Sequence, residues 1–200
     1  MAKSVGVNPK RTAGGRTARD YTIVIAYDGE LTEDEYFRGW KLLIPPSRLN
    51  LEHTYVRSGG NVLDAVENAI KKKKKYRNFA EFWCVCDVDD TDDEVLAQAR
   101  NLANSNEIKL CTSNRCFEIW IALHFRFSDR HVGSEREAID MVKEYHAQYG
   151  DPYKTMPFHI LYDLTDNAIA NARRLERGGS VSPSTRVHNL VRKLKQNCSE

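Results

Sequence analysis

Several features that mark large classes of proteins are missing from this sequence. No apolar run approaches the length of about 18 residues that a membrane-spanning helix needs. The first residues are rich in Gly, Lys and Arg and hold no apolar stretch of the kind found in signal peptides. These absences favour a cytoplasmic protein. The 200 residues, 41% of them hydrophobic, are enough for one ordinary domain with a buried core.

Cysteine patterns that bind zinc or form a disulfide framework are missing too. The five cysteines are an odd number, and Cys-x-x-Cys pairs or Cys/His pairs at ligand spacing do not occur. We therefore expect reduced thiols that pack as small hydrophobic groups. Aromatic residues do not alternate with the basic runs, which argues against a stacking platform for single-stranded nucleic acid.

The net charge is only +2, but the charged residues are distributed unevenly. Basic residues gather in 1–20, in the lysine run 71–75 and in 171–200, whereas acidic residues gather in 28–35 and 87–94. Basic ends around an acidic centre suit a protein that binds polyphosphate chains such as nucleic acid and performs metal chemistry on them. For the lysine run alone, a solvated face without a ligand is an equally good interpretation.

Short apolar segments alternate with helical patterns along the chain. We expect strands at 21–27, 51–57, 82–88 and 108–111. We expect helices from Thr32 to before Pro45, at 62–75, at 92–104, after a cap at Ser113-Asn114, and at 134–149, 160–177 and 184–197. This order predicts an α/β fold, with a mostly parallel four-stranded sheet covered by helices on both faces.

Three regions follow from this pattern. Residues 1–20 are expected to form a basic flexible arm, and residues 21–130 the α/β core. Residues 131–200 are expected to form a helical region that packs on the core.

Acidic residues follow two of the predicted strands directly. Asp28 and Glu30 come after the first strand, and Asp87 and Asp89 come at the end of the third. The carboxyl ends of parallel strands share one edge of a sheet, so these side chains converge if the strands lie near each other. Carboxylates together with water are the ligands that Mg²⁺ and Mn²⁺ prefer. The sequence therefore predicts a metal site that acts on phosphate groups.

Three alternatives to such a metal site fit the Asp-x-Asp motif less well. Acidic residues often simply cap strand ends and helix starts. A calcium-binding EF-hand loop beginning at Asp87 would need Gly at position 92 and Glu at position 98, where the chain has Asp92 and Gln98. The motif also resembles the nucleophile motif of haloacid-dehalogenase-like phosphatases, in which Asp87 would be phosphorylated. That motif belongs on the first strand, whereas here it follows the third.

Three segments resemble the RloB-like family. Residues 27–37 are similar to its Cys-Glu-Gly-Glu-x-Thr-Glu-x-x-Tyr-Phe opening, and residues 83–90 to its Trp-x-Val-x-Asp-x-Asp-Asp segment. Residues 113–120 resemble its Ser-Asn-Pro-Cys-Phe-Glu-x-Trp signature. Further similar positions are Leu123-His124-Phe125, Ala168-Ile169, Ala172, Pro183-Ser184-Thr185 and Val187-His188. The resemblance runs in order from about residue 21 to residue 195.

The resemblance implies a Toprim-like core with Mg²⁺ or Mn²⁺ held by Asp28, Asp87 and Asp89. It also implies a role beside restriction and phage-defence systems, with nucleic acid as the partner. We expect a metal-dependent nuclease that cleaves RNA, including tRNA, or DNA in antiviral defence, together with a protein partner of a defence system. The alternative is a non-catalytic Toprim-like module that binds nucleic acid or serves as a sensor subunit.

Two positions depart from the family pattern. Asp28 stands where the family has Glu, so its carboxylate is one methylene shorter, and Glu30 or Glu33 would have to compensate. Arg115 stands where the family has Pro and adds a positive charge near the acidic site, where it would pair with a carboxylate or hold a phosphate.

Further candidate residues have roles in the site or in phosphate binding. Glu118 is an acid in a very apolar helix, which suggests an extra metal ligand or an orienting group. The residues expected to bind phosphate or nucleic acid are Arg115, His124, Arg186, His188 and Lys73. A core histidine is the alternative for His124, and a helix cap is the alternative for the segment around Arg186.

Overall fold

The computed structural model describes residues 21–57, 61–76, 79–88, 90–150 and 154–198. The predicted basic arm at 1–20 and the predicted metal ligand Asp89 lie outside these residues. In chain order the elements are β1 (Thr22–Tyr27), α1 (Thr32–Leu43), β2 (Asn50–Tyr55), α2 (Val62–Lys73), β3 (Glu81–Asp87), α3 (Asp93–Ser105), β4 (Ile108–Asn114), α4 (Glu118–Phe125), α5 (Glu135–Lys143), α6 (Phe158–Asp163), α7 (Thr165–Arg177), β5 (Ser184–Thr185) and α8 (Val187–Lys195).

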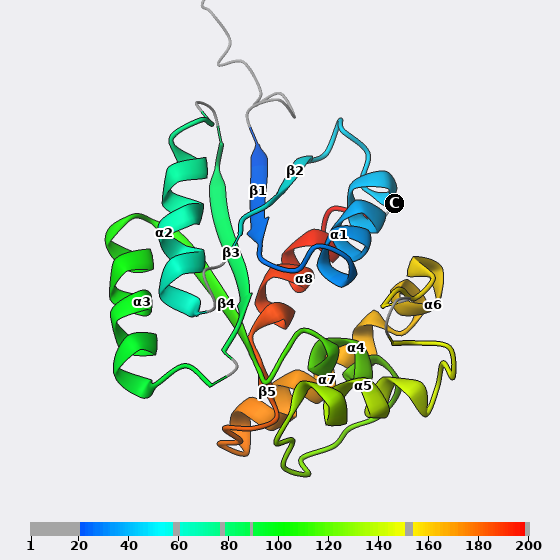
Figure 1. The fold of residues 1–200 in the computed structure, drawn as a ribbon. Coiled ribbons are helices and arrows are strands. Elements are labelled where there is room, and N and C mark those ends of the chain that lie inside the picture. Colours follow the sequence, from blue (N-terminus) through cyan, green and yellow to red (C-terminus); the bar gives the residue numbers. More distant parts are fainter. Residues whose placement is uncertain (1–20, 58–60, 77–78, 89, 151–153, 199–200) are drawn as a thin grey trace, which may run out of the picture.

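Within the described residues the strands form one five-stranded sheet in the order β2-β1-β3-β4-β5 (Figure 1). The first four strands are parallel, and β5 runs antiparallel to β4. The prediction of an α/β fold with a mostly parallel sheet flanked by helices is confirmed, and it is consistent with a Toprim-like core. The sheet has five strands rather than the predicted four.

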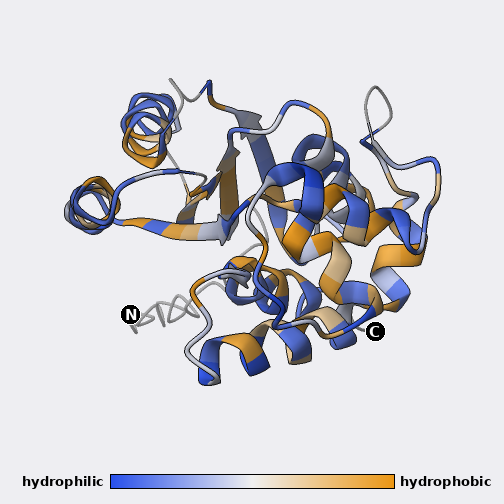
Figure 2. Cartoon of the chain, turned by 60° about the horizontal axis from the view of Figure 1, so that its bottom comes forward, coloured by the Kyte–Doolittle hydropathy of each residue, from blue (hydrophilic) through white to orange (hydrophobic). Residues whose placement is uncertain are grey.

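Helices cover both faces of the sheet. Alternate residues of β1 point to opposite faces, so Ile23 and Ile25 join one hydrophobic cluster while Val24 and Ala26 join the other. Helices α2 and α3 cover the second cluster, and α1, α4, α5, α7 and α8 contribute to the first. In Figure 2 the two helices seen nearly end-on at the left carry hydrophobic residues towards the sheet.

The predicted core residues are buried. Trp40, Trp83 and Trp120 are at most 6% exposed. The cysteines are free thiols, with Cys198 half-buried and the other four buried, as expected for reduced cysteines.

Several element boundaries differ from the prediction. Strand β4 continues to Asn114, so Ser113 and Asn114 lie in the sheet and do not cap a helix. Ser113 pairs through its hydroxyl with Thr185 of β5 at 2.9 Å. The first two residues of the predicted helix at 184–197 therefore form strand β5, and the helix α8 starts at Val187. The predicted helix at 160–177 is divided at Leu164 into α6 and α7. The predicted helix at 134–149 ends earlier, at Lys143.

Candidate functional site

The sheet order brings the ends of β1 and β3 together. The two strands are parallel neighbours, with Tyr27 opposite Val85. Asp28 follows Tyr27 directly, and Asp87 is the last residue of β3. Both carboxylates therefore lie at the carboxyl edge of the sheet, which is where open α/β sheets bind their ligands.

A cavity of about 250 Å³ lies at this edge. Three of its acidic side chains come from three different elements: Glu33 from the first turn of α1, Asp87 from β3 and Glu118 from the start of α4. The other described lining residues are Gly29, Glu30, Leu31, Thr32, Glu135 and Lys154. We call this space the acidic cavity.

Glu33 is an acid of the acidic cavity whose pKa is strongly raised. It is only 4% exposed, and burial raises its pKa to about 8, with further contributions from the charges of Asp28 and Glu118. Its carboxylate lies against Gly29, where an added Cβ would come within 1.9 Å of Oε2. The sequence suggested Glu33 only as a substitute for Asp28. The signal that was available is the glycine four residues before it, which leaves room for the carboxylate.

Glu118 is also buried, at 4% exposure, and its Oε1 accepts two hydroxyl hydrogen bonds. Tyr149 donates at 3.0 Å and Thr32 at 3.4 Å. The Thr32 hydroxyl has a single hydrogen, which it shares between the Glu118 Oε1 and the closer backbone carbonyl of Lys154, at 2.9 Å. The N-cap of α1 is Leu31, and the Thr32 hydroxyl contacts Glu118 and the Lys154 carbonyl instead of capping the helix. Sequence reasoning missed Tyr149, because its place in the site depends on packing between distant segments.

Lys154 brings an amine to the acidic cavity and is the one cation among its described lining residues. Burial works against the charged amine, but its hydrogen bond to Glu135 and the charge of Glu118 outweigh burial and raise the pKa of Lys154. The side chain is 27% exposed, so it lies at the mouth of the cavity. Neither Lys154 nor Glu135 was predicted.

The donors of the acidic cavity fit a hard divalent cation. They include carboxylate oxygens, and the pKa of Glu33 is raised first by burial and then by the negative charges of Asp28 and Glu118, which a bound cation would offset. Of the predicted ligands, Asp87 lines the cavity and would hold Mg²⁺ or Mn²⁺ there, whereas Asp28 does not line it but lies near enough for its charge to act on Glu33. Among the described residues, no group of three or more His, Cys, Asp and Glu side chains has the arrangement of a metal site. The third predicted ligand, Asp89, lies outside them.

Two predicted phosphate-binding histidines are buried in the protein and do not reach the acidic cavity. His124 is 0% exposed, its Nδ1 lies 2.9 Å from the Trp120 carbonyl, and burial lowers its pKa to about 4. His188 is 1% exposed, and burial likewise lowers its pKa to about 4. Its Nε2 lies 3.2 Å from Glu176. Both predictions are corrected, because neutral, enclosed imidazoles do not contact a strand of nucleic acid.

The predicted basic residues lie in three different places. Arg115 pairs with Asp90, directly after the Asp-x-Asp segment. Arg186 pairs with Glu176 and lines a second cavity, on the other side of the end of β3. Lys73 pairs with Glu107 at 3.6 Å, next to the first residues of β3 and β4. That is the opposite edge of the sheet from the acidic cavity, so Lys73 does not reach this cavity, and its role in binding nucleic acid stays a prediction.

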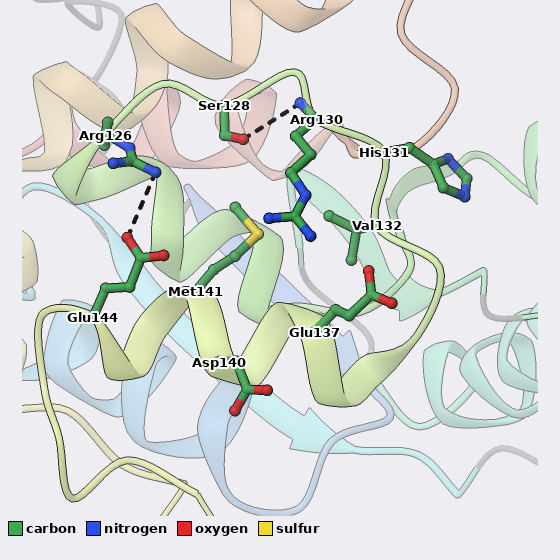
Figure 3. Close-up of a pocket in the computed structure, with 9 residues that line it drawn as sticks. All are labelled: Arg126, Ser128, Arg130, His131, Val132, Glu137, Asp140, Met141 and Glu144. Carbon is green, nitrogen blue, oxygen red and sulfur yellow. Dashed lines mark hydrogen bonds and ion pairs between the residues drawn. The ribbon is translucent and has the colours of Figure 1, made fainter.

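A cavity of about 180 Å³ lies apart from the predicted residues, between α5 and the segment that leads to it (Figure 3). Arg126 and Glu144 form an ion pair at 3.5 Å on one side, and Arg130 points into the space between Met141 and Glu137. Acidic and basic groups are mixed here, so this cavity does not resemble a metal site.

The fold and the acidic cavity define an α/β protein with carboxylates gathered at the carboxyl edge of a mostly parallel sheet. The family model described as RloB-like protein matches residues 23–194, and the chain belongs to this family. No curated protein and no solved structure matches the chain in the other two comparisons. In the described part of the chain, every helix is too short or too polar to cross a membrane.

Proposed function

We propose that this protein is a metal-dependent nuclease that hydrolyses phosphodiester bonds of RNA, including tRNA, or of DNA. The observation that carries the proposal is the acidic cavity, in which Glu33, Asp87 and Glu118 line one space at the carboxyl edge of the sheet. Membership of the RloB-like family and the resemblance to Toprim nucleases support the same chemistry. A role in antiviral defence, with a protein partner from a defence system, is part of the proposal.

Each acidic residue has a separate task in this proposal. Asp28 and Asp87, with Asp89, would hold Mg²⁺ or Mn²⁺, and this ion would supply polarisation of the phosphoryl group and activation of water. Hydrolysis forms a bond between water oxygen and phosphorus and breaks the bond from phosphorus to the leaving sugar oxygen, which takes up a proton. Glu33 exchanges protons during this step, because it lines the same cavity as Asp87 and burial raises its pKa. Glu118 is held in place by Tyr149 and Thr32.

A cleavage assay tests the assignment. Labelled tRNA, single-stranded RNA and duplex DNA are incubated with the purified protein and Mn²⁺ or Mg²⁺, with a chelator as the blank. We expect Glu33→Gln to slow cleavage by about 10²–10⁴-fold while leaving Mn²⁺ binding in place. Asp87→Asn should lose both cleavage and Mn²⁺ binding.

The matched control is Glu35→Gln, because Glu35 is an exposed acid on the same helix as Glu33. It should cleave at the wild-type rate. Cleavage that persists in Asp87→Asn would show that the acidic cavity is not the active site.

A non-catalytic module that binds nucleic acid or acts as a sensor is the second candidate. It is favoured by Asp28, whose carboxylate is one methylene shorter than the Glu of the family pattern and so reaches less far towards a cation. Binding of nucleic acid without cleavage of any substrate in the same assay would support this function over the first.

A further inference from the structure

A second cavity, of about 420 Å³, lies beside the end of β3. We call it the second cavity. Two consecutive residues at the end of β3 line the two cavities: Asp87 lines the acidic cavity, and Val88 lines the second cavity. The other walls come from α3, from the end of β4, and from the segment between α7 and β5, which approach one another at the lower end of the sheet in Figure 1. A volume of this size falls in the range of about 300–1,000 Å³ that is typical of small-molecule sites.

Hydrogen-bond donors from separate elements meet in the second cavity. Arg100 comes from α3, and Arg186 follows β5 and is fixed by its ion pair with Glu176. The Thr91 Oγ1 is buried and has no hydrogen-bond partner among the described residues. A buried hydroxyl in this condition is costly unless a ligand or water pairs with it. Thr112, Asn114 and Thr185 add polar groups to the lining, whereas the hydroxyls of Ser180 and Ser184, which also line the cavity, donate to the backbone carbonyls of Pro183 and Val181.

The charges and the apolar wall limit which ligand fits. Two arginines line the second cavity, and the acids Asp93 and Glu176 line it as well. A near-balance of charge suits a group with one or two negative charges better than a triphosphate. Val88, Leu96 and Val181 supply apolar surface of the kind that packs against a base.

We propose that the second cavity binds one nucleoside phosphate unit, with its phosphate on Arg100 and Arg186. This inference rests on the proposed nuclease function, because the nucleoside phosphate in the second cavity is taken to be part of the nucleic acid strand that the protein cleaves. The strand then crosses the end of β3, with the scissile phosphate in the acidic cavity and a neighbouring nucleotide in the second cavity. The same chemistry fits a free mononucleotide.

Binding measured without divalent metal separates this site from cleavage. The probe is a short labelled single-stranded RNA, with affinity measured in a chelator by fluorescence anisotropy. We expect Arg100→Gln to weaken binding about tenfold, as for loss of a charge-assisted hydrogen bond. Thr91→Val, which keeps the shape of the side chain, should also weaken it. The control Arg136→Gln, in an exposed arginine of α5, should bind as the wild type does.

A second arm uses adenosine monophosphate alone, measured by calorimetry. RNA binding that depends on Arg100, without binding of the mononucleotide, supports a unit of the substrate strand. Mononucleotide binding that is lost in Arg100→Gln supports a free nucleotide in the same cavity. RNA and mononucleotide affinities that are unchanged in both Arg100→Gln and Thr91→Val would overturn the proposal. The nuclease assignment would then still stand or fall on the Asp87→Asn cleavage assay.

Discussion

At the scale of single residues, Glu33 couples the stability of the protein to pH. In the unfolded chain its carboxyl ionises near its ordinary pKa of 4.5, whereas in the folded protein it keeps its proton up to about pH 8. The folded state therefore binds more protons than the unfolded state between these two values. Stability must fall as pH rises through this window and then level off.

Replacing Glu33 by Gln removes this dependence. Without divalent metal, we expect Glu33→Gln to match the wild type near pH 4 and to exceed it at pH 8 by more than about 1.4 kcal/mol, the free energy of one pKa unit. Urea unfolding at a series of pH values measures the difference. Glu35→Gln should show no such trend, and a wild-type stability that is flat from pH 5 to 8 would contradict the assigned burial.

Tyr149 gives a second test at this scale, because its hydroxyl donates to a buried carboxylate. We expect Tyr149→Phe to destabilise the protein by about 1–3 kcal/mol, since Glu118 loses its shorter hydroxyl hydrogen bond. Tyr145→Phe is the matched control, because Tyr145 is 42% exposed. Equal unfolding midpoints for the two variants would show that the contact between Tyr149 and Glu118 does not stabilise the fold.

At the scale of elements, the turn from β1 to α1 places the acidic cavity. Gly29 allows the Glu33 carboxylate to lie against the backbone, and a methyl group there would occupy the position of its oxygens. We expect Gly29→Ala to displace Glu33 and to lower cleavage by at least tenfold, while the fold is retained. Gly178→Ala, whose added Cβ would meet its nearest atom at 3.4 Å, should leave activity unchanged. Circular dichroism checks that the fold is retained. Full cleavage activity in Gly29→Ala would show that the position of Glu33 does not matter for catalysis.

The elements also show what the sequence could predict. Strands β1 and β3 are short, apolar and followed by acids, so their positions and the edge they share were predictable. Strand β5 has only two residues, too few for a periodic pattern, and it forms through pairing with the distant β4. The burial of His124 and His188 likewise depends on tertiary packing, because a histidine in a helix has the same local sequence whether it faces solvent or a core.

At the scale of the whole molecule, the two edges of the sheet differ in character. The acidic cavity and the second cavity lie at the carboxyl edge, whereas Lys73, from the lysine run, lies at the amino edge. Lysine side chains at the amino edge are therefore expected to influence long nucleic acids more than short ones. Replacing Lys71, Lys74 and Lys75 with Ser should weaken binding of long duplexes, with a smaller salt dependence, and leave short RNA binding nearly unchanged.

The proposed chemistry depends above all on a divalent cation bound by the carboxylates of the acidic cavity. The most direct test is an anomalous difference map from crystals of the protein grown or soaked with Mn²⁺. We expect a peak in the acidic cavity, bonded to Asp87 and within reach of Asp28, that is lost in Asp87→Asn. A cation bound only elsewhere, or a peak that persists in Asp87→Asn, would contradict a metal site at this edge of the sheet.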